Sequence, residues 1–281
     1  MKKTASKIYT GIIFAFLFAP IIILLIFSFN AGKSLSVFSG FSLRWYKELL
    51  NDANTLEALK NSLILAFSAT TIAVVLGTMA SVGINKLRSR WYRTTIDTVT
   101  NIPMTNPDII TGISLMLMFV FVGRLFGAST SLNFLTMLIA HVTFCLPYVI
   151  LSVMPKFKQL QNLTYEAALD LGATPVYAFF KVVLPEIMPG IVSGFLLSFT
   201  MSVDDFVITH FTRGAGINTL STLIYSQVKV GVRPTLFALS TIIFVAVFVV
   251  LIIINVLSSR SEKRGSTGMS NRRMVAMLLI L

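Results

Sequence analysis

The chain has 281 residues, of which 55% are hydrophobic and only 12% are charged. Soluble globular proteins carry about 25% charged residues, so this composition excludes a water-soluble fold and indicates an integral membrane protein. The net charge of +12 does not indicate a nucleic-acid partner, because the basic residues gather in short loops between apolar segments. The single cysteine, Cys145, cannot form a disulfide within the chain and is interpreted as a packed core thiol.

Six apolar segments are long enough to cross a bilayer as helices, which requires about 20 residues each. They cover residues 8–30, 58–84, 95–126, 132–155, 185–210 and 235–258. Their length favours a helical bundle over a barrel, whose strands alternate over about 10 residues. The first segment follows Lys2, Lys3 and Lys7 and has no small-residue cleavage site after it, so it is predicted to remain as an anchor.

Six spans place both termini on one side of the membrane, and the basic residues indicate which side. With the termini in the cytoplasm, most of the 23 lysines and arginines lie in inner segments. The sequence therefore predicts a multi-pass protein with cytoplasmic termini. The first outer loop, about 31–57, is long enough for a short surface helix at the sequence RWYKELL.

The third segment contains Pro103 and Pro107, and a proline removes a backbone donor and clashes with the preceding turn. A kink or break is therefore expected there, which membrane proteins tolerate where the backbone lines a cavity or is buried in protein. The sequence Asn106-Pro107-Asp108 also predicts a helix start, with Asn106 as the N-cap and Pro107 at the first helical position. For Asp108, a role at the helix start and a role in a cation pathway both remain open.

The longest inner loop, residues 156–184, is predicted to contain two short helices, over residues 163–171 and 175–183. Gly172 is expected to end the first helix, because glycine is the preferred residue just beyond a helix C-terminus. A proline at the first helical position, after Thr174, is expected to begin the second helix.

The same loop carries a motif of spaced residues. Its members are Glu166, Ala167, Ala168, Gly172, Leu184 and Pro185, and Val182 stands at one further motif position. This pattern resembles the EAA motif of ABC importer permeases, with Val182 in place of isoleucine. The resemblance implies that the loop forms coupling helices that dock on a cytoplasmic ATPase. Because the chain has no G-x-x-x-x-G-K-[ST] sequence, ATP and magnesium are expected on that ATPase and no cofactor on this chain.

The fifth segment ends in SFTMSVDDFVITHF, which places Asp204 and Asp205 side by side after a long apolar run. Acids at membrane depth are rare and are functional by default. On a continuous helix over 185–210, Asp205 is expected to share a face with the small residues Gly190, Gly194, Ser198 and Ser202. That stripe suits helix packing or a pathway wall, and a partly hydrated pair at the membrane interface is the alternative. Arg213 could fold back to pair with Asp205.

Several segments carry a further resemblance: NPDIITGISLM, HVTFCLPYVI, the DD region and IYSQVKVGVRPTLFALSTI. Over residues 8–258 the chain is similar to the PotC-type permease subunits of spermidine/putrescine ABC importers. A pathway for such polycations needs acids for the ammonium groups and aromatic or apolar walls for the methylene spine. The candidate pathway residues are Asp108, Tyr148, Asp204, Asp205 and Tyr225. His141 is interpreted as a hydrogen-bonded packing residue.

The resemblance implies an all-α integral membrane protein with six transmembrane helices in the type I ABC importer permease fold, located in the bacterial inner membrane. It implies a permease that is not an enzyme, with no catalytic residue. No metal site is expected either, because no cluster of ligand residues has the required spacing. The expected partners are a homologous second permease subunit, an ATPase dimer, an extracytoplasmic polyamine-binding protein and the lipid bilayer.

Two alternatives remain open. The first is an ABC importer permease for another small cation or solute, such as thiamine, ferric ion or an opine. The second is an ATP-independent secondary transporter or channel, against which the EAA motif argues.

Residues 1–260 are predicted to form one permease domain, and residues 261–281 a polar tail with a short apolar end. That end is too short to span a bilayer. It resembles the start of an anchor or of a fused segment, and an interfacial tail is the alternative.

Overall fold

The computed structural model describes residues 2–33, 37–87, 89–127, 132–159, 162–245 and 248–249. The chain divides into two units, one made of residues 1–52 with 230–281 and the other of residues 53–229. Every named element in the described ranges is helical, and a single isolated bridge pairs Asn30 with Phe41. The expectation of an all-α fold is confirmed.

Five of the described helices are long and apolar enough to cross a bilayer: Tyr9–Ser28, Ala53–Lys86, Asp108–Leu125, Phe134–Lys158 and Pro175–Asp204. A shorter apolar helix covers Pro234–Val245. The predicted sixth span, 235–258, begins in this helix and continues into residues outside the described ranges. The predicted tail, 261–281, lies entirely outside them.

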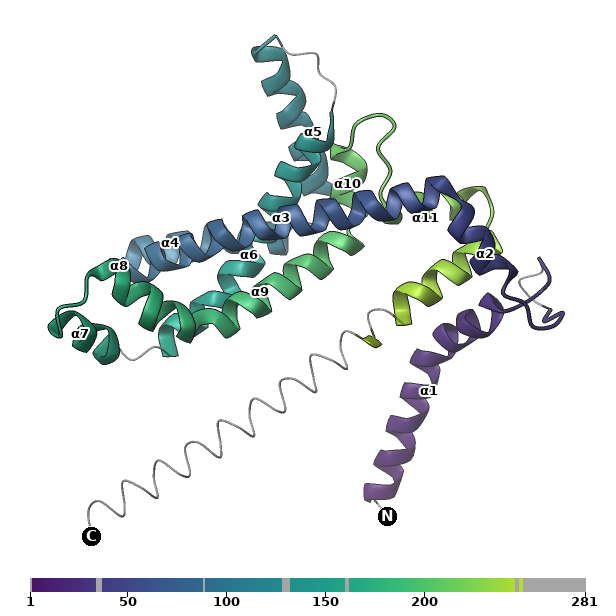
Figure 1. The fold of residues 1–281 in the computed structure, drawn as a ribbon, viewed down its shortest axis with the longest axis horizontal. Coiled ribbons are helices and arrows are strands. Elements are labelled where there is room, and N and C mark those ends of the chain that lie inside the picture. The colour runs from purple at the N-terminus through teal and green to yellow at the C-terminus, as the bar shows by residue number, and fades with distance from the viewer. Residues whose placement is uncertain are drawn as a thin grey trace. The chain divides into compact units, whose positions relative to one another are not determined.

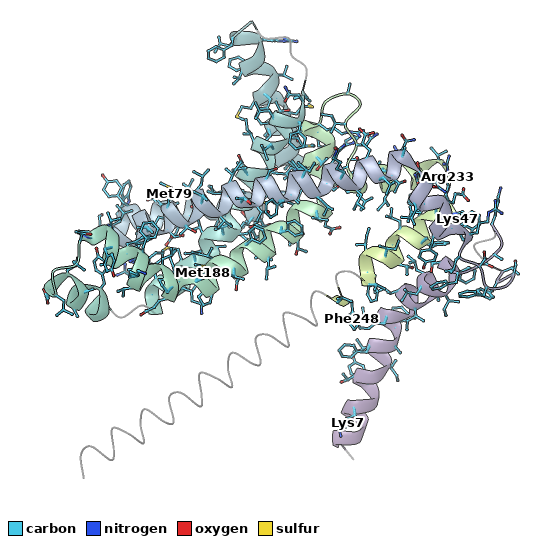
Figure 2. The ribbon with its side chains drawn as sticks, in the orientation of Figure 1. Lys7, Lys47, Met79, Met188, Arg233 and Phe248 are labelled. Carbon is cyan, nitrogen blue, oxygen red and sulfur yellow. The ribbon has the colours of Figure 1, made fainter. Side chains whose placement is uncertain are left out.

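The bundle of the larger unit consists of α3 (Ala53–Lys86), α6 (Phe134–Gln159) and α9 (Leu184–Asp204), which pack side by side (Figure 1). Glycines allow this approach: a Cβ at Gly77 would lie 2.8 Å from the Val149 side chain. Large apolar side chains also cover the outside of the bundle, where Met79 and Met188 are exposed (Figure 2). An apolar exterior is what a helix that faces lipid requires.

The third predicted span is two helices, α4 (Arg90–Thr105) and α5 (Asp108–Leu125). The expected break is confirmed at Pro107, whereas α4 continues through Pro103. The predicted cap is shifted by one residue, because Pro107 itself stands at the N-cap of α5 and Asn106 closes α4. Only α5 is long and apolar enough to cross a bilayer, so the prediction of one span over 95–126 is wrong for its polar first half.

The inner loop begins with α7 (Asn162–Asp170). Gly172, just beyond the end of this helix, has a left-handed backbone conformation with a φ of 87°. The amide of Gly172 donates to the Leu169 carbonyl at 2.9 Å, and the next amide donates to the Ala168 carbonyl at 3.0 Å. The hydroxyl of Thr174 accepts from the Tyr177 amide and caps the following helix. The expected helix end at Gly172 and the expected helix start at Thr174 and Pro175 are both confirmed.

The second predicted loop helix does not end at residue 183. The helix α8 (Pro175–Ala178) continues through the π-helical segment η1 (Phe179–Val183) directly into α9. One unbroken helical rod of 30 residues therefore joins the inner loop to Asp204.

The predicted fifth span is shorter than expected, because α9 ends at Asp204 and Asp205 is extended, with a ψ of 123°. The chain then forms α10 (Val207–Thr212) and α11 (Leu220–Val230). The short helix α10 packs on α5, where a Cβ at Gly112 would lie 3.0 Å from the Phe211 ring. The prediction of one continuous helix over 185–210 is therefore wrong.

The smaller unit begins with α1 (Lys2–Ser28) and continues to α2 (Arg44–Asn51). The helix expected at RWYKELL is confirmed as α2. The indole of Trp45 is buried and donates to the Asn30 carbonyl at 2.6 Å, and the Ser28 hydroxyl lies 2.7 Å from that of Tyr46. These bonds hold α2 against the end of α1.

Candidate functional site: an acidic cavity at a helix break

The break between α9 and α10 is built around the carboxylate of Asp205. The amides of Ile208 and Thr209 donate to its oxygens at 3.3 and 2.8 Å, and the Thr209 hydroxyl donates at 3.0 Å. A carboxylate at a helix start satisfies free amides and complements the helix dipole. The side chain is only 5% exposed, so protein groups and not water surround the carboxylate of Asp205.

His141 joins this break to α6. Its ring is fully buried; Nδ1 lies 2.8 Å from the Ser202 hydroxyl and Nε2 lies 2.9 Å from the Thr209 hydroxyl. Nε2 is also 3.6 Å from Oδ2 of Asp205. The interpretation of His141 as a hydrogen-bonded packing residue is confirmed, and its partners come from both sides of the break.

A further bond reaches Asp205 from α11, because the Ser221 hydroxyl donates to the Asp205 carbonyl at 2.7 Å. Arg213 does not pair with Asp205. Its guanidinium donates to the Ile217 carbonyl at 3.2 Å and to the side chains of Asn218 and Thr222. The suggested ion pair is therefore wrong, and the conformation of Asp205 is set by neutral donors.

The stripe of small residues on α9 serves helix packing. Gly190, Gly194, Ser198 and Ser202 are all buried. A Cβ at Gly190 would lie 2.8 Å from the Ser152 carbonyl oxygen, and the Ser198 hydroxyl donates to the Cys145 carbonyl at 3.3 Å. Of the two interpretations left open by the sequence, close packing against α6 is the one that the contacts support.

A cavity of about 280 Å³ lies at the break. Its lining residues are Asp108, Phe144, Thr200, Met201, Asp204, Asp205, Phe206 and Val207. The start of α5, after the Pro107 break, thus meets the end of α9. Both Asp108 and Asp204 are exposed, and within the described residues neither carboxylate has a hydrogen bond or an ion pair. The cavity therefore presents two free carboxylates beside two aromatic rings.

The two candidate tyrosines are not among the lining residues, but each packs against a ring that is. The Tyr148 ring packs edge-on against Phe144 at 5.4 Å between centroids, and the Tyr225 ring lies 4.3 Å from Phe206. The ammonium of Lys229 is 5.4 Å from the centroid of Tyr225. Tyr225 thus already pairs with a cation of its own chain, and each tyrosine contacts one aromatic ring of the cavity lining.

The residues of the spaced motif occupy two environments. Glu166 and Ala167 are exposed on α7, and Gly172 is exposed beyond its end. Leu184 packs against the buried core of the bundle, and Pro185 follows it at the start of α9. Next to the exposed part lies an open depression lined by Ala168, Leu171, Gly172, Ala173, Thr174 and Tyr177. Leu171 is 88% exposed there.

Sequence reasoning missed the partners that shape the break. Thr209 and Ser221 are separated from His141 by 68 and 80 positions in the chain, so no local pattern links them. One signal was available: an aspartate followed four residues later by a hydroxyl residue, in DFVIT, is compatible with a helix start at that aspartate.

Comparison with known proteins finds membrane components of transport systems. A family model described as "Binding-protein-dependent transport system inner membrane component" matches residues 73–264. The chain is 43% identical over 251 residues to the "Putrescine transport system permease protein PotI" of Escherichia coli K12, covering 89% of each chain. It is 37% identical over 256 residues to the "Spermidine/putrescine transport system permease protein PotC" of the same organism, covering 91% of this chain and 94% of PotC.

Solved structures show the same fold. One chain of a bacterial ABC transporter that imports the acidic polysaccharide alginate superposes with a TM-score of 0.69 at 17% identity. The match covers 92% of this chain and 95% of the other.

Proposed function

We propose that this chain, which belongs to the family of binding-protein-dependent transport system inner membrane components, is the permease subunit of an ATP-driven importer of polyamines. Its relatives PotI and PotC are permease proteins for putrescine and for spermidine/putrescine. Members of this family are transporter subunits and not enzymes. Putrescine and spermidine are the proposed substrates, and the chain forms half of the pathway through which they cross the membrane.

The observation that carries this proposal is the cavity with two free carboxylates, Asp108 and Asp204. A polyamine is a flexible polycation that loses the hydration of its ammonium groups when it enters a membrane protein. Carboxylates replace that hydration, and aromatic faces attract cations and accept the methylene spine. Asp108 and Asp204 supply the charge, while Phe144 and Phe206 supply the wall.

Asp205 belongs to the same pathway in a different role. Its oxygens are occupied by Ile208 and Thr209, so it shapes the break that leaves Asp204 free. Tyr148 and Tyr225 pack against the rings of Phe144 and Phe206. We assign direct contact with the ammonium groups to Asp108 and Asp204.

Coupling to ATP hydrolysis is proposed to run along the helical rod Pro175–Asp204. Glu166, Ala167 and Ala168 on α7, with Gly172, form the docking surface for a cytoplasmic ATPase, which binds ATP and magnesium. At 1.5 Å per residue the rod is about 45 Å long, and its far end carries Asp204. A displacement of the docked loop therefore moves one wall of the acidic cavity directly, with Leu184 and Pro185 at the point where the rod enters the bundle.

The complete transporter is proposed to contain a homologous second permease subunit, an ATPase dimer and an extracytoplasmic polyamine-binding protein. The family description supports a binding protein. The second permease completes the pathway, because Asp108 and Asp204 of this chain are exposed at the cavity. We place the protein in the bacterial inner membrane with its termini in the cytoplasm.

The test is uptake of labelled putrescine and spermidine by the complete complex in sealed vesicles, with and without ATP. Accumulation that requires ATP and the binding protein is expected. Uptake driven by an ion gradient without the ATPase would contradict an ATP-driven importer. Transport of thiamine, ferric ion or an opine in place of polyamines would leave the class intact and refute the substrate.

A further inference from the structure

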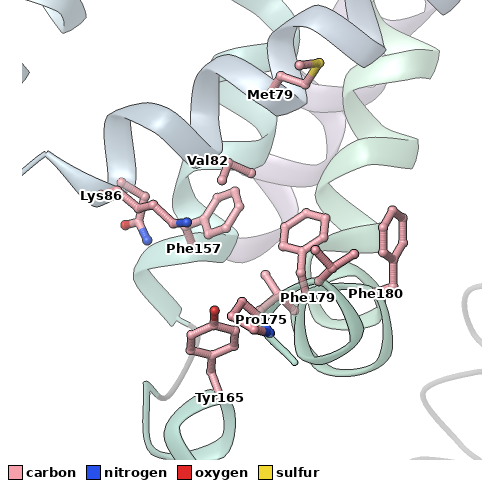
Figure 3. A pocket seen from close by; sticks show the side chains of 11 residues that line it. Met79, Val82, Lys86, Phe157, Tyr165, Pro175, Phe179 and Phe180 are labelled. Atoms are coloured by element: carbon pink, nitrogen blue, oxygen red, sulfur yellow. The ribbon is translucent and has the colours of Figure 1, made fainter. Parts of the chain in front are cut away.

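A further cavity, of about 560 Å³, lies near the ends of α3 and α6 that carry Lys86 and Phe157 (Figure 3). It lies between the end of α3, the end of α6, the inner-loop helix α7 and the segments α8 and η1. Its lining residues are Met79, Val82, Asn85, Lys86, Phe157, Tyr165, Pro175, Val176, Phe179, Phe180 and Val183. The function proposed above uses none of the space inside it.

This cavity is amphipathic. Lys86 and the Tyr165 hydroxyl lie on one side of it, and the Phe179 and Phe180 rings lie on the opposite side (Figure 3). Met79 extends the apolar part along α3. A ligand that matches this distribution has an anionic or hydrogen-bonding head and an apolar tail.

Lys86 is the charge at the polar end. It is exposed, and within the described residues it has no ion pair and no hydrogen bond. A lysine in the last turn of a helix also complements the helix dipole, but that role does not require an aromatic cavity beside it. The free ammonium next to an apolar cavity therefore indicates an anionic group with an attached hydrocarbon.

The position along α3 agrees with the boundary of a bilayer. The apolar run of α3 ends at Ile84, and Asn85 and Lys86 follow immediately. The helix has 34 residues and is about 51 Å long, whereas the hydrocarbon core is about 30 Å thick. One end of α3 therefore extends beyond the hydrocarbon core, and the polar residues Asn85 and Lys86 favour the headgroup region for this end.

The wall opposite Lys86 is formed by the π-helical segment η1. Its Phe179 and Phe180 rings are 5.5 Å apart, edge to face, and Phe180 is exposed. Single π-helical turns are rare and occur frequently at functional sites. Here the turn places two consecutive aromatic rings along the cavity.

We propose that this cavity binds one anionic phospholipid, with its phosphate on Lys86 and one acyl chain along Phe179 and Phe180. The argument for this occupant is charge complementarity: the loop around Lys86 is basic, and the cytoplasmic leaflet that it faces is anionic. The inference rests on the proposed function for the side of the membrane that α3 reaches.

A lipid in this place would link the coupling loop to two spans. Tyr165 lies directly before Glu166 of the docking surface, and Phe179 belongs to the rod that reaches Asp204. The bound lipid would hold α7 against the ends of α3 and η1. Substrate-stimulated ATP hydrolysis by the complex is therefore expected to be faster in phosphatidylglycerol than in phosphatidylcholine.

The direct test is native mass spectrometry of the purified complex, incubated with phosphatidylglycerol or with phosphatidylcholine. The parent complex is expected to retain phosphatidylglycerol preferentially. Lys86→Gln is expected to weaken that retention about tenfold, because it removes a charge-assisted contact. Phe180→Ala, at an exposed position that should not disturb folding, is expected to weaken retention of both lipids. Arg90→Gln removes a nearby charge at the start of α4, outside the cavity lining, and is the matched control.

Three results would overturn the lipid site: equal retention of both lipids by the parent, unchanged retention in Lys86→Gln, or displacement by inorganic phosphate alone. Retention by the isolated permease pair that disappears when the ATPase binds would show that a protein side chain occupies the cavity instead. Since retention is measured without transport, a complex that binds lipid as expected but imports no polyamine would refute the proposed function and leave the lipid site standing.

Discussion

His141 and Asp205 lie in contact, with Nε2 of the imidazole 3.6 Å from Oδ2 of the carboxylate, and both side chains are almost completely enclosed by protein. They come from α6 and from the break between α9 and α10. The imidazole also contacts the hydroxyls of Ser202 and Thr209 on the two sides of that break. The geometry of the acidic cavity therefore depends on a histidine that does not line it.

Replacing this histidine tests its structural role. His141→Ala leaves the Ser202 hydroxyl without its buried partner, whereas the Thr209 hydroxyl keeps its bond to Asp205; an unsatisfied buried polar group costs about 1–3 kcal/mol. We expect a lower unfolding temperature of the detergent-solubilised complex. His210→Ala is the control, because this histidine is exposed and stacks on the Phe206 ring, four residues earlier in the chain. Equal unfolding temperatures for the His141 variant and the parent would show that the network does not stabilise the break.

The two free carboxylates are expected to act on substrate and not on folding. Asp108→Asn and Asp204→Asn should each raise the KM for putrescine uptake about tenfold, because each removes one charge partner of an ammonium group. Neither carboxylate has a partner within the described residues, so assembly and unfolding temperature should stay unchanged. Asp97→Asn, on α4 and outside the cavity lining, is the matched control. A parental KM in both variants would remove these acids from the pathway.

Asp205 is expected to behave differently from its neighbour. An asparagine retains one acceptor oxygen and loses the other, so Asp205→Asn weakens the cap that holds Ile208 and Thr209. Loss of such a cap costs about 1 kcal/mol. We expect a lower unfolding temperature together with reduced uptake, whereas Asp204→Asn reduces uptake alone. Thermal unfolding measured beside uptake for the two variants separates these roles, and identical profiles would contradict the division.

Gly172 tests the coupling surface. Its φ of 87° is strained for any residue with a Cβ, by about 1–2 kcal/mol. Gly172→Ala should therefore shift the end of α7 and reduce substrate-stimulated ATP hydrolysis while the protein still inserts. Gly216→Ala introduces the same kind of strain at a φ of 83°, outside the loop and likewise with open space around the new Cβ. If both variants lowered ATP hydrolysis equally, the effect could not be assigned to coupling.

Much of the fold could be predicted from local sequence. Apolar length identified the spans, and proline chemistry located the break before α5. Gly172 and Thr174 were recognised because the residues that end and begin helices act within one turn. The boundaries that were wrong share one cause: local patterns could not show that α8 and η1 continue into α9, or that α9 stops at Asp204.

By itself the sequence determined the membrane class, the approximate positions of the spans that the structure describes and the spaced motif of the inner loop, because these depend on residues close together in the chain. Only the tertiary structure decided the roles of the two adjacent aspartates. Their separation depends on His141 and Thr209, which lie 68 positions apart and meet only when α6 packs beside the break. Protein donors then enclose Asp205, and Asp204 is left at the end of the rod, facing the cavity that it shares with Asp108.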